Sequence, residues 1–325
     1  MSLKIIKTGL LDTIQDGGRY VVAHLGVGPG GAMDRLSAAM ANALLGKDPR
    51  APVLEMHFPA AVMELDAPTV FAITGADFSP RINGMPIPLN QPICITEDAV
   101  LSFEKKNSGT RCYLAMLNEW NLPLWMNSYS TNLKANAGGY HGRSLQKGDE
   151  LFYEILPAPT KEKLRLLPWR LPVEENANRD ISFLPGPDWP LMTTAVQRDF
   201  LNKTFEISSA SDRMGYRLAG EVPANEPLPQ LVSSAVGFGT IQWLPSGGFI
   251  VLMADHQTTG GYPRIGQVTT SGLHRLAQMN AGEQLQFQLA SGKEAEESFC
   301  EQQDFLLQLQ NTCKLKMENF LHASI

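Results

Sequence analysis

The chain has 325 residues, a length more typical of two domains than of one. With 43% hydrophobic and 18% charged residues it is expected to be globular, and a disordered chain is excluded. A net charge of -6 and a pI near 5.6 argue against broad binding to nucleic acid or anionic membranes, leaving small molecules and other proteins as expected partners.

Short strands dominate the predicted secondary structure, because 28 glycines and 22 prolines divide the chain into brief segments. Acidic turns precede strand patterns in both halves, as two similar barrel-like domains would show. The fold class is therefore predicted to be mainly β. The clearest strand candidates are 70–74, 113–117, 181–184, 204–208 and 249–254.

Few helices are expected. The best begins at Asp34 as N-cap, shows apolar residues at helical spacing and ends at Gly46. Further helices are predicted at about 189–202, 271–279 and 293–316.

The proline-rich segment 156–178 is predicted to be an extended connection between the halves. The predicted organisation is an N-terminal domain 1–160, a C-terminal domain 161–292 and a helical extension 293–325.

No metal, membrane or export signal is found in the sequence. The four cysteines form no CxxC pair and have no histidine at zinc-ligand spacing. No apolar stretch approaches the roughly 18 residues of a membrane helix, and the N-terminus lacks a signal-peptide pattern. We therefore expect a cytoplasmic protein that binds no metal.

Two glycine-containing segments near the N-terminus carry candidate binding residues. In the first, Gln15, Asp16 and Arg19 surround Gly17-Gly18; this is either a binding loop for a carboxylate or phosphate, or a turn with a surface ion pair. In the second, the glycine-rich run 28–33 enters the helix at Asp34, which predicts either an anion site or plain capping. It lacks the lysine and hydroxyl of a P-loop.

Two aspartates, Asp77 and Asp255, each follow an apolar strand, where a carboxylate suits a general base or a ligand contact but also often starts a turn. The loop after Asp255 favours function, because it gathers an imidazole, an amide, hydroxyls and a phenol around Gly-Gly. Its candidates are His256, Gln257, Thr258, Thr259 and Tyr262.

Two further polar loops, 208–217 with Asp212 and Arg213, and 138–143 with Arg143, are each either a turn or part of a site.

Taken in order, these motifs resemble the family variously called allophanate hydrolase subunit 2, KipA-like or biotin-dependent carboxyltransferase. The resemblance runs from about residue 3 to 290. It is carried by 12–19, 30–34, 75–77, 142–143, 211–215 and 257–263.

The resemblance implies two cyclophilin-like β-barrel domains. It also implies partners: a KipI-like protein (the B component of 5-oxoprolinase) and a LamB/YcsF-like protein (the A component of 5-oxoprolinase). The implied function is that of one component of an ATP-dependent 5-oxoprolinase, a cyclic amide hydrolase active only with its partners, with ATP used by the complex. Alternatives are a carboxyltransferase component, with biotin carried by another protein, and a non-catalytic antagonist that binds a KipI-like protein.

Site residues are assigned on the same basis. Asp212, Arg213 and Asp255 are expected to be catalytic, with the arginine holding a carboxylate or phosphate and an aspartate moving protons. The expected substrate-binding residues are Gln15, Asp16, Arg19, Asp34, Asp77, Arg143, Gln257, Thr258, Thr259 and Tyr262.

Loops from both domains are predicted to line one cleft, which a partner completes. The chain departs from the family pattern at 117–130. Leu117-Asn118-Glu119-Trp120 stands where relatives tend to carry Gly-Gly, and Asn127-Ser128-Tyr129 stands where they tend to carry Gly-Ser-Arg. This departure puts an anionic contact, and the usual substrate, in question.

Overall fold

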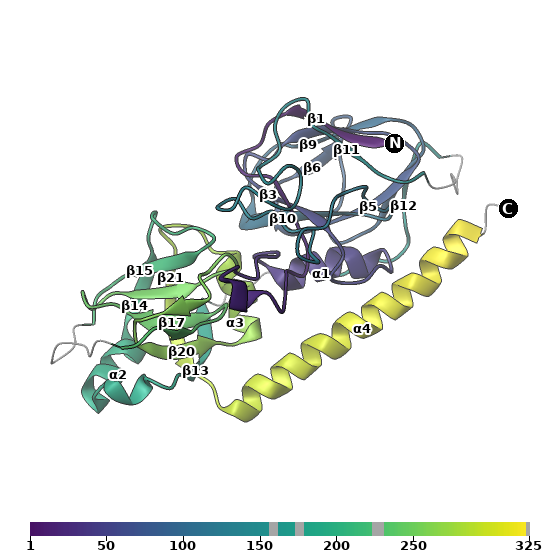
Figure 1. Ribbon diagram of the computed structural model, residues 1–325. Helices are drawn as coiled ribbons and strands as arrows, with labels where there is room; N and C mark the ends of the chain where they lie inside the picture. Colours follow the sequence, from purple (N-terminus) through teal and green to yellow (C-terminus); the bar gives the residue numbers. More distant parts are fainter. Residues whose placement is uncertain (156–161, 173–178, 223–230, 323–325) are drawn as a thin grey trace. The chain divides into compact units, whose positions relative to one another are not determined.

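The computed structural model describes residues 1–155, 162–172, 179–222 and 231–322 (Figure 1). The chain forms two compact units. The first comprises Met1–Arg19, Asp34–Glu175 and Gln303–Ile325, and the second comprises Tyr20–Met33 and Asn176–Gln302. The boundary predicted at residue 160 falls outside the described residues.

In its described part the first unit contains two six-stranded antiparallel sheets. One sheet has the order β11 (Glu150–Phe152), β1 (Ser2–Lys7), β4 (Val62–Leu65), β9 (Ala99–Phe103), β6 (Pro80–Ile82) and β7 (Met85–Pro86). The other has the order β12 (Leu164–Leu166), β8 (Ile93–Ile95), β5 (Thr69–Asp77), β10 (Ser108–Met116), β3 (Val53–His57) and β2 (Thr13–Gln15).

In this unit, a strand face is buried where the core or a helix covers it and exposed elsewhere. On β1, Leu3 and Ile5 point into the core while Lys4 is exposed, as expected of a strand with one buried face. β5 is buried almost throughout, because α1 (Arg35–Leu44) packs against β5 and β10. Burying each large apolar side chain fully stabilises the fold by about 1.5–3 kcal/mol.

The helix predicted from Asp34 is confirmed as α1. Asp34 accepts hydrogen bonds from the backbone N–H of Ser37 at 3.0 Å and from its hydroxyl at 2.6 Å. The capping interpretation of Asp34 is therefore correct, and the cap satisfies an N–H that lacks a helical partner.

The described part of segment 156–178 corrects the expectation of an extended connection. β12 pairs with β8, and Trp169 is buried and donates from Nε1 to the Leu44 carbonyl at 3.0 Å. The prolines at 157, 159, 168 and 172 flank 163–166, which leaves those N–H groups able to pair.

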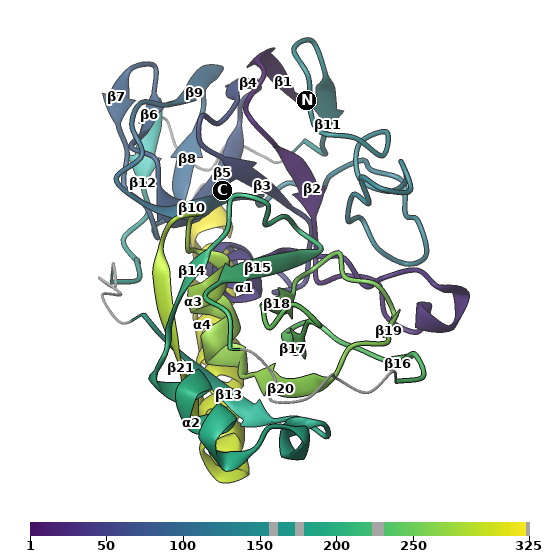
Figure 2. The ribbon, with the colours of Figure 1, turned by 90° about the vertical axis from the view of Figure 1, so that its left-hand side faces the viewer.

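In the second unit seven strands close into a barrel, because β21 pairs in parallel with β13 (Figure 2). Their order is β13 (Asp180–Pro185), β20 (Arg264–Val268), β17 (Thr240–Trp243), β18 (Phe249–Leu252), β15 (Gly215–Ala219), β14 (Thr204–Ile207) and β21 (Gln284–Leu289). A separate ribbon joins β16 (Ser234–Ala235) to β19 (Thr259–Gly260). The mainly β prediction is confirmed.

Aromatic residues fill the barrel core. The rings of Phe200 and Phe287 stack at 5.0 Å, and Phe183, Phe205 and Phe249 contact them edge-on or at a tilt. Such pairs add about 0.5–1.5 kcal/mol each to the stabilisation from burial.

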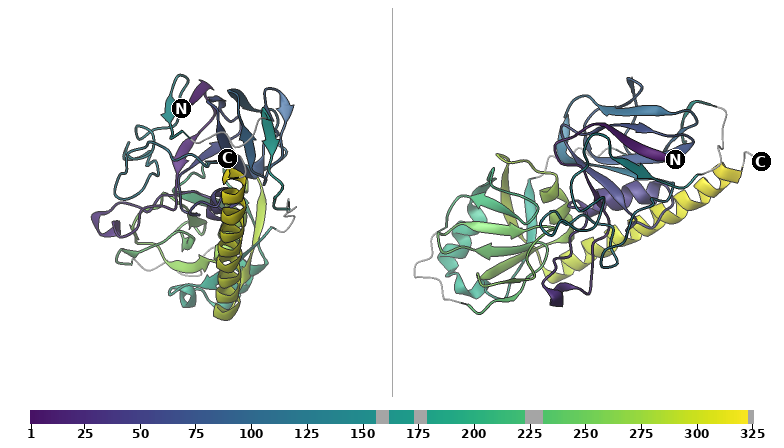
Figure 3. Two further views of the ribbon diagram at one scale, coloured as in Figure 1. Left: turned by 90° about the vertical axis from the view of Figure 1, so that its right-hand side faces the viewer. Right: turned by 45° about the horizontal axis from the view of Figure 1, so that its top comes forward.

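The remaining helices refine the predictions. The helix expected at 189–202 is split into a 3-10 turn, Trp189–Leu191, and α2 (Thr194–Asn202), because Met192 is extended and Thr193 caps α2. α3 covers Thr270–Ala277, and α4 runs from Gly292 to His322, longer than predicted (Figure 3). Among the described residues no helix carries enough consecutive apolar residues to span a bilayer.

Candidate functional site

Asp16 is the centre of a buried hydrogen-bond network in the first unit. Its carboxylate accepts from the N–H of Gly18 at 2.8 Å, the hydroxyl of Ser128 at 2.8 Å and the N–H of Tyr129 at 2.6 Å, and also from the Ser130 hydroxyl. Asp16 thus fixes the 128–130 loop against the end of β2. Gly17-Gly18 therefore forms the predicted turn, and the same carboxylate also holds the polar 128–130 loop in a fixed conformation.

Arg19 is buried beside this network. Its guanidinium donates to the Ser130 carbonyl and lies 4.5 Å from the centroid of the Trp125 ring, a cation–π contact. Gly138 packs close by, because a Cβ there would lie 2.3 Å from the Ser130 carbonyl oxygen. A surface ion pair for Arg19 is therefore excluded, since the side chain is 1% exposed.

Gln15 is fully buried at the end of β2. Its amide nitrogen donates to Thr13 Oγ1 at 3.0 Å, while Oε1 has no hydrogen-bond partner among the residues that the structure describes. A buried amide oxygen without a protein donor is a candidate acceptor for a hydrogen bond from a ligand or a water molecule.

Replacing Asp16 by alanine is expected to lower the free energy of unfolding by about 2–3 kcal/mol, because several buried donors lose a charged acceptor. Asp16→Asn, which keeps one acceptor oxygen, should lose less. Denaturant unfolding measures both. Asp199→Ala, at an exposed carboxylate of α2, is the control, and equal losses in Asp16→Ala and Asp199→Ala would contradict the network.

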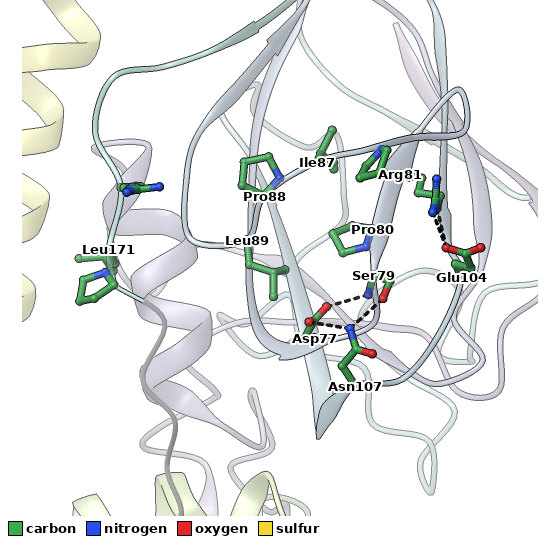
Figure 4. Close-up of a pocket in the computed structure, with 13 residues that line it drawn as sticks. Asp77, Ser79, Pro80, Arg81, Ile87, Pro88, Leu89, Glu104, Asn107 and Leu171 are labelled. Carbon is green, nitrogen blue, oxygen red and sulfur yellow. Dashed lines mark hydrogen bonds and ion pairs between the residues drawn. The ribbon is translucent and has the colours of Figure 1, made fainter.

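Asp77 ends β5 and lines a cavity of ≈850 Å³ in the first unit (Figure 4). Its carboxylate accepts from the Ser79 N–H at 2.8 Å and from the Asn107 amide at 2.9 Å. Across the cavity Arg81 is paired with Glu104. Asp77 therefore starts a turn and also faces a polar-rimmed cavity.

Arg143 is held in a bidentate ion pair with Asp149, at 2.6 and 2.8 Å. Partial burial opposes the charged form of Asp149, but the hydrogen bonds from Arg143 and from the Gln146 N–H keep the pKa of Asp149 below its usual value. The guanidinium is thus already committed to a carboxylate of its own loop.

In the second unit Arg213 and Asp255 form a buried ion pair. Arg213 donates from Nε to Asp255 at 2.8 Å and from Nη2 at 3.1 Å, and Nη2 also donates to the Gly31 carbonyl at 2.7 Å. The pair joins the loop before β15 to the loop after β18. It also ties segment 20–33 to the barrel.

Segment 20–33 approaches the same loop closely. A Cβ at Gly28 would lie 2.5 Å from the His256 carbonyl oxygen, so only glycine fits there. His256 is 4% exposed, and its Nδ1 lies 2.6 Å from the Gln257 carbonyl oxygen.

Asp212 occupies a turn rather than an ion pair. Its Oδ1 accepts from the N–H groups of Met214 at 2.8 Å and Gly215 at 3.2 Å, and the residue is exposed. This geometry orients the carboxylate and leaves it accessible to a ligand.

The rest of the polar loop forms the β16–β19 ribbon and its flanks. Thr259 lies in β19, and the N–H of Val236 donates to the Thr258 carbonyl at 3.2 Å. Gln257 and Thr258 are half-buried, while Tyr262 is 47% exposed. These side chains border an accessible surface that offers donors and acceptors.

The expected site residues fall into two sets. Gln15, Asp16, Arg19, Asp34, Asp77 and Arg143 belong to the first unit, and the other seven belong to the second. Within their own units Asp16 and Arg19 share the Ser130 contact, and Arg213 and Asp255 touch directly. The convergence of both sets on one cleft stays a prediction.

The altered loop 117–130 has mostly structural contacts. Asn118 is buried and hydrogen-bonded to Thr69, and Trp120 packs edge-on against Tyr153. Glu119 lies 3.1 Å from the buried Lys47 ammonium, whose pKa burial lowers despite the attraction of Glu119. In this chain the loop thus supplies Glu119 as a counter-charge for buried Lys47, and it has no arginine for an anionic ligand.

No group of three or more histidine, cysteine or acidic side chains is placed to hold a metal ion within the described ranges. Sequence reasoning missed Gln242, which is buried on β17 with its amide nitrogen unpaired among those residues. The available signal was a glutamine between two apolar residues of a strand.

Comparisons with known proteins agree with the motifs. The family model described as "Carboxyltransferase domain, subdomain A and B" matches residues 25–289. A protein of Escherichia coli (strain K12), named as the C subunit of 5-oxoprolinase, is 34% identical over 94% of this chain and 97% of its own length. Its namesake in Haemophilus influenzae is 32% identical over 87% of this chain and 89% of its own.

The crystal structure of the Kluyveromyces lactis urea carboxylase superposes with a TM-score of 0.86 at 25% identity, covering 95% of this chain. This chain spans only 29% of that larger protein. The family expected from the motifs is thus confirmed: the chain belongs to the family of carboxyltransferase domains with subdomains A and B.

Proposed function

We propose that this protein is one component of a 5-oxoprolinase complex, which uses ATP to open 5-oxoproline to glutamate. The observation that carries the proposal is the near full-length match to two proteins that bear the name of the 5-oxoprolinase C subunit. The urea carboxylase likeness covers a small part of a larger protein, so it supports the fold more than the substrate.

The polar surface of the second unit suits a small polar amide. Asp212 offers an accessible, oriented carboxylate, which can take or give a proton. Arg213 holds Asp255 in place, so it acts as a positioning residue for that carboxylate. The hydroxyl and amide groups of Gln257, Thr258, Thr259 and Tyr262 supply hydrogen bonds to substrate.

We propose that the nucleotide binds elsewhere in the complex and not on this chain. Arg213, which was expected to hold a carboxylate or phosphate, is paired with Asp255, and the expected substrate-binding residue Arg143 is paired with Asp149. We assign ATP to one of the two partners, the KipI-like or the LamB/YcsF-like protein. We also propose that the complex is cytoplasmic.

Carboxyl transfer is the second candidate, favoured by the urea carboxylase superposition. The chain has no Ala-Met-Lys-Met type lysine, so biotin would have to arrive on another protein.

The test is reconstitution of this chain with a KipI-like and a LamB/YcsF-like protein. Glutamate released from 5-oxoproline, dependent on ATP and on this chain, is the expected result. Product that instead requires carboxybiotin would favour transfer. Tight association with neither activity would overturn both enzymatic functions and leave the antagonist role.

A further inference from the structure

Gln242 lies on the outer face of the barrel, beneath the β16–β19 ribbon. Its neighbours on β17, Ile241 and Trp243, point into the apolar core, so the alternation of a strand turns Gln242 outward. The side chain is nevertheless only 1% exposed. An outward-facing glutamine is thus covered by the polar loop that follows Asp255.

The amide nitrogen of Gln242 occupies the space above Gly260. A Cβ added at Gly260 would lie 2.4 Å from Nε2, with the Val236 side chain at 3.4 Å. Gly260 is not in the left-handed backbone region that favours glycine. The absence of a side chain at 260 is therefore explained by the room that the amide needs.

This amide nitrogen has no hydrogen-bond partner among the described residues. Leaving a buried donor unpaired is costly, and proteins retain such groups where water or a ligand completes the bond. Gln242 stands directly under Thr259-Gly260, the β19 portion of the predicted binding loop.

We propose that the Gln242 amide is a substrate-binding group, which donates from Nε2 to a carbonyl or carboxylate oxygen of a small amide bound at Gly260. The inference rests on the proposed function for the identity of that amide, 5-oxoproline. In this role Gln242 sets specificity, because a site that pairs a buried amide discriminates against molecules without the matching oxygen.

Two substitutions separate binding from packing. Gln242→Met keeps the size and removes the donor, and Gly260→Ala displaces the amide. The expected result in the reconstituted complex is a rise of about 10- to 100-fold in KM for 5-oxoproline, as for loss of a hydrogen bond to a charged or polarised oxygen. Gly237→Ala is the matched control, because its Cβ meets nothing closer than 4.0 Å.

Stability provides the second readout, which needs no activity. Gln242→Met removes no hydrogen bond made by that amide nitrogen within the described protein, so its melting temperature should equal or exceed that of the wild type. An unchanged KM in Gln242→Met would overturn the inference, and a lower melting temperature in the same variant would show that the amide is structural. A wild-type complex without 5-oxoprolinase activity would refute the proposed function, and a lowered melting temperature of Gln242→Met would separately overturn the binding role of the amide.

Discussion

Replacing Arg213 by alanine is expected to lower the free energy of unfolding by about 3–5 kcal/mol, the range for breaking one side of a buried ion pair. The loss is large because Asp255 keeps its buried charge after its guanidinium partner is removed. The Gly31 carbonyl loses its guanidinium donor in the same step. Segment 20–33 should therefore loosen together with the barrel loops.

Denaturant unfolding at neutral pH measures this loss. Arg217→Ala is the matched control, because Arg217 is an exposed arginine of the adjoining strand, and it should change stability by no more than about 0.5 kcal/mol. If both variants lost the same small amount, the pair between Arg213 and Asp255 would not be stabilising in the way the structure indicates.

A double-mutant cycle separates the ion pair from the arginine's other contacts. Arg213→Ala combined with Asp255→Ala should destabilise less than the sum of the two single changes, since neither charge of the pair is left behind. The remaining loss would report the Gly31 contact. If the two losses simply added, the interaction energy between Arg213 and Asp255 would be zero, and each residue would stabilise the protein through other contacts.

The sequence predicted those elements whose signals are local. α1 was found because Asp34, the apolar spacing and Gly46 lie within one short stretch. Strands such as β5 and β10 were found from their β-branched and aromatic runs. The acidic turns also preceded strands, as at β9, β11 and β21.

Pairings between distant residues were not predictable in this way. β12 was missed because its three residues are recognisable only by their partner β8, and the prolines around them suggested a connection. The partner of Arg143 lies six residues away, in a turn whose geometry sets the contact. The grouping of 20–33 with the second unit comes from contacts with residues far along the chain, such as the hydrogen bond between Arg213 and the Gly31 carbonyl.

The candidate site shows the same limit. Residue types in polar loops pointed to Arg213, Asp255 and Asp16, but only the fold shows that Arg213 and Asp255 neutralise each other. Gln242 was not predicted because it lies in a strand and not in a polar loop. It stands out only by its amide nitrogen, which lies unpaired beneath Gly260 among the described residues. Such a feature arises from packing, and a single sequence does not express it.

Asp12 is expected to make stability fall as the pH rises from about 4 to about 7. Burial raises the pKa of Asp12 to about 7 from 3.8, against the lowering effect of the Ala61 and His57 N–H groups. Because the folded-state pKa lies above the unfolded value, the contribution of Asp12 is fully present below pH 3.8 and is lost as the pH passes through 7.

Asp12→Asn cannot ionise, so it should gain about 3–4 kcal/mol relative to the wild type between pH 4 and pH 7. At low pH it should be the less stable protein, because its NH2 group faces one of the two N–H donors, from Ala61 at 2.8 Å and His57 at 3.3 Å. Denaturant unfolding at several pH values gives the difference curve. Asp48→Asn controls for the loss of one charge, and a flat curve for Asp12→Asn would mean that Asp12 ionises in the folded protein as easily as in the unfolded chain.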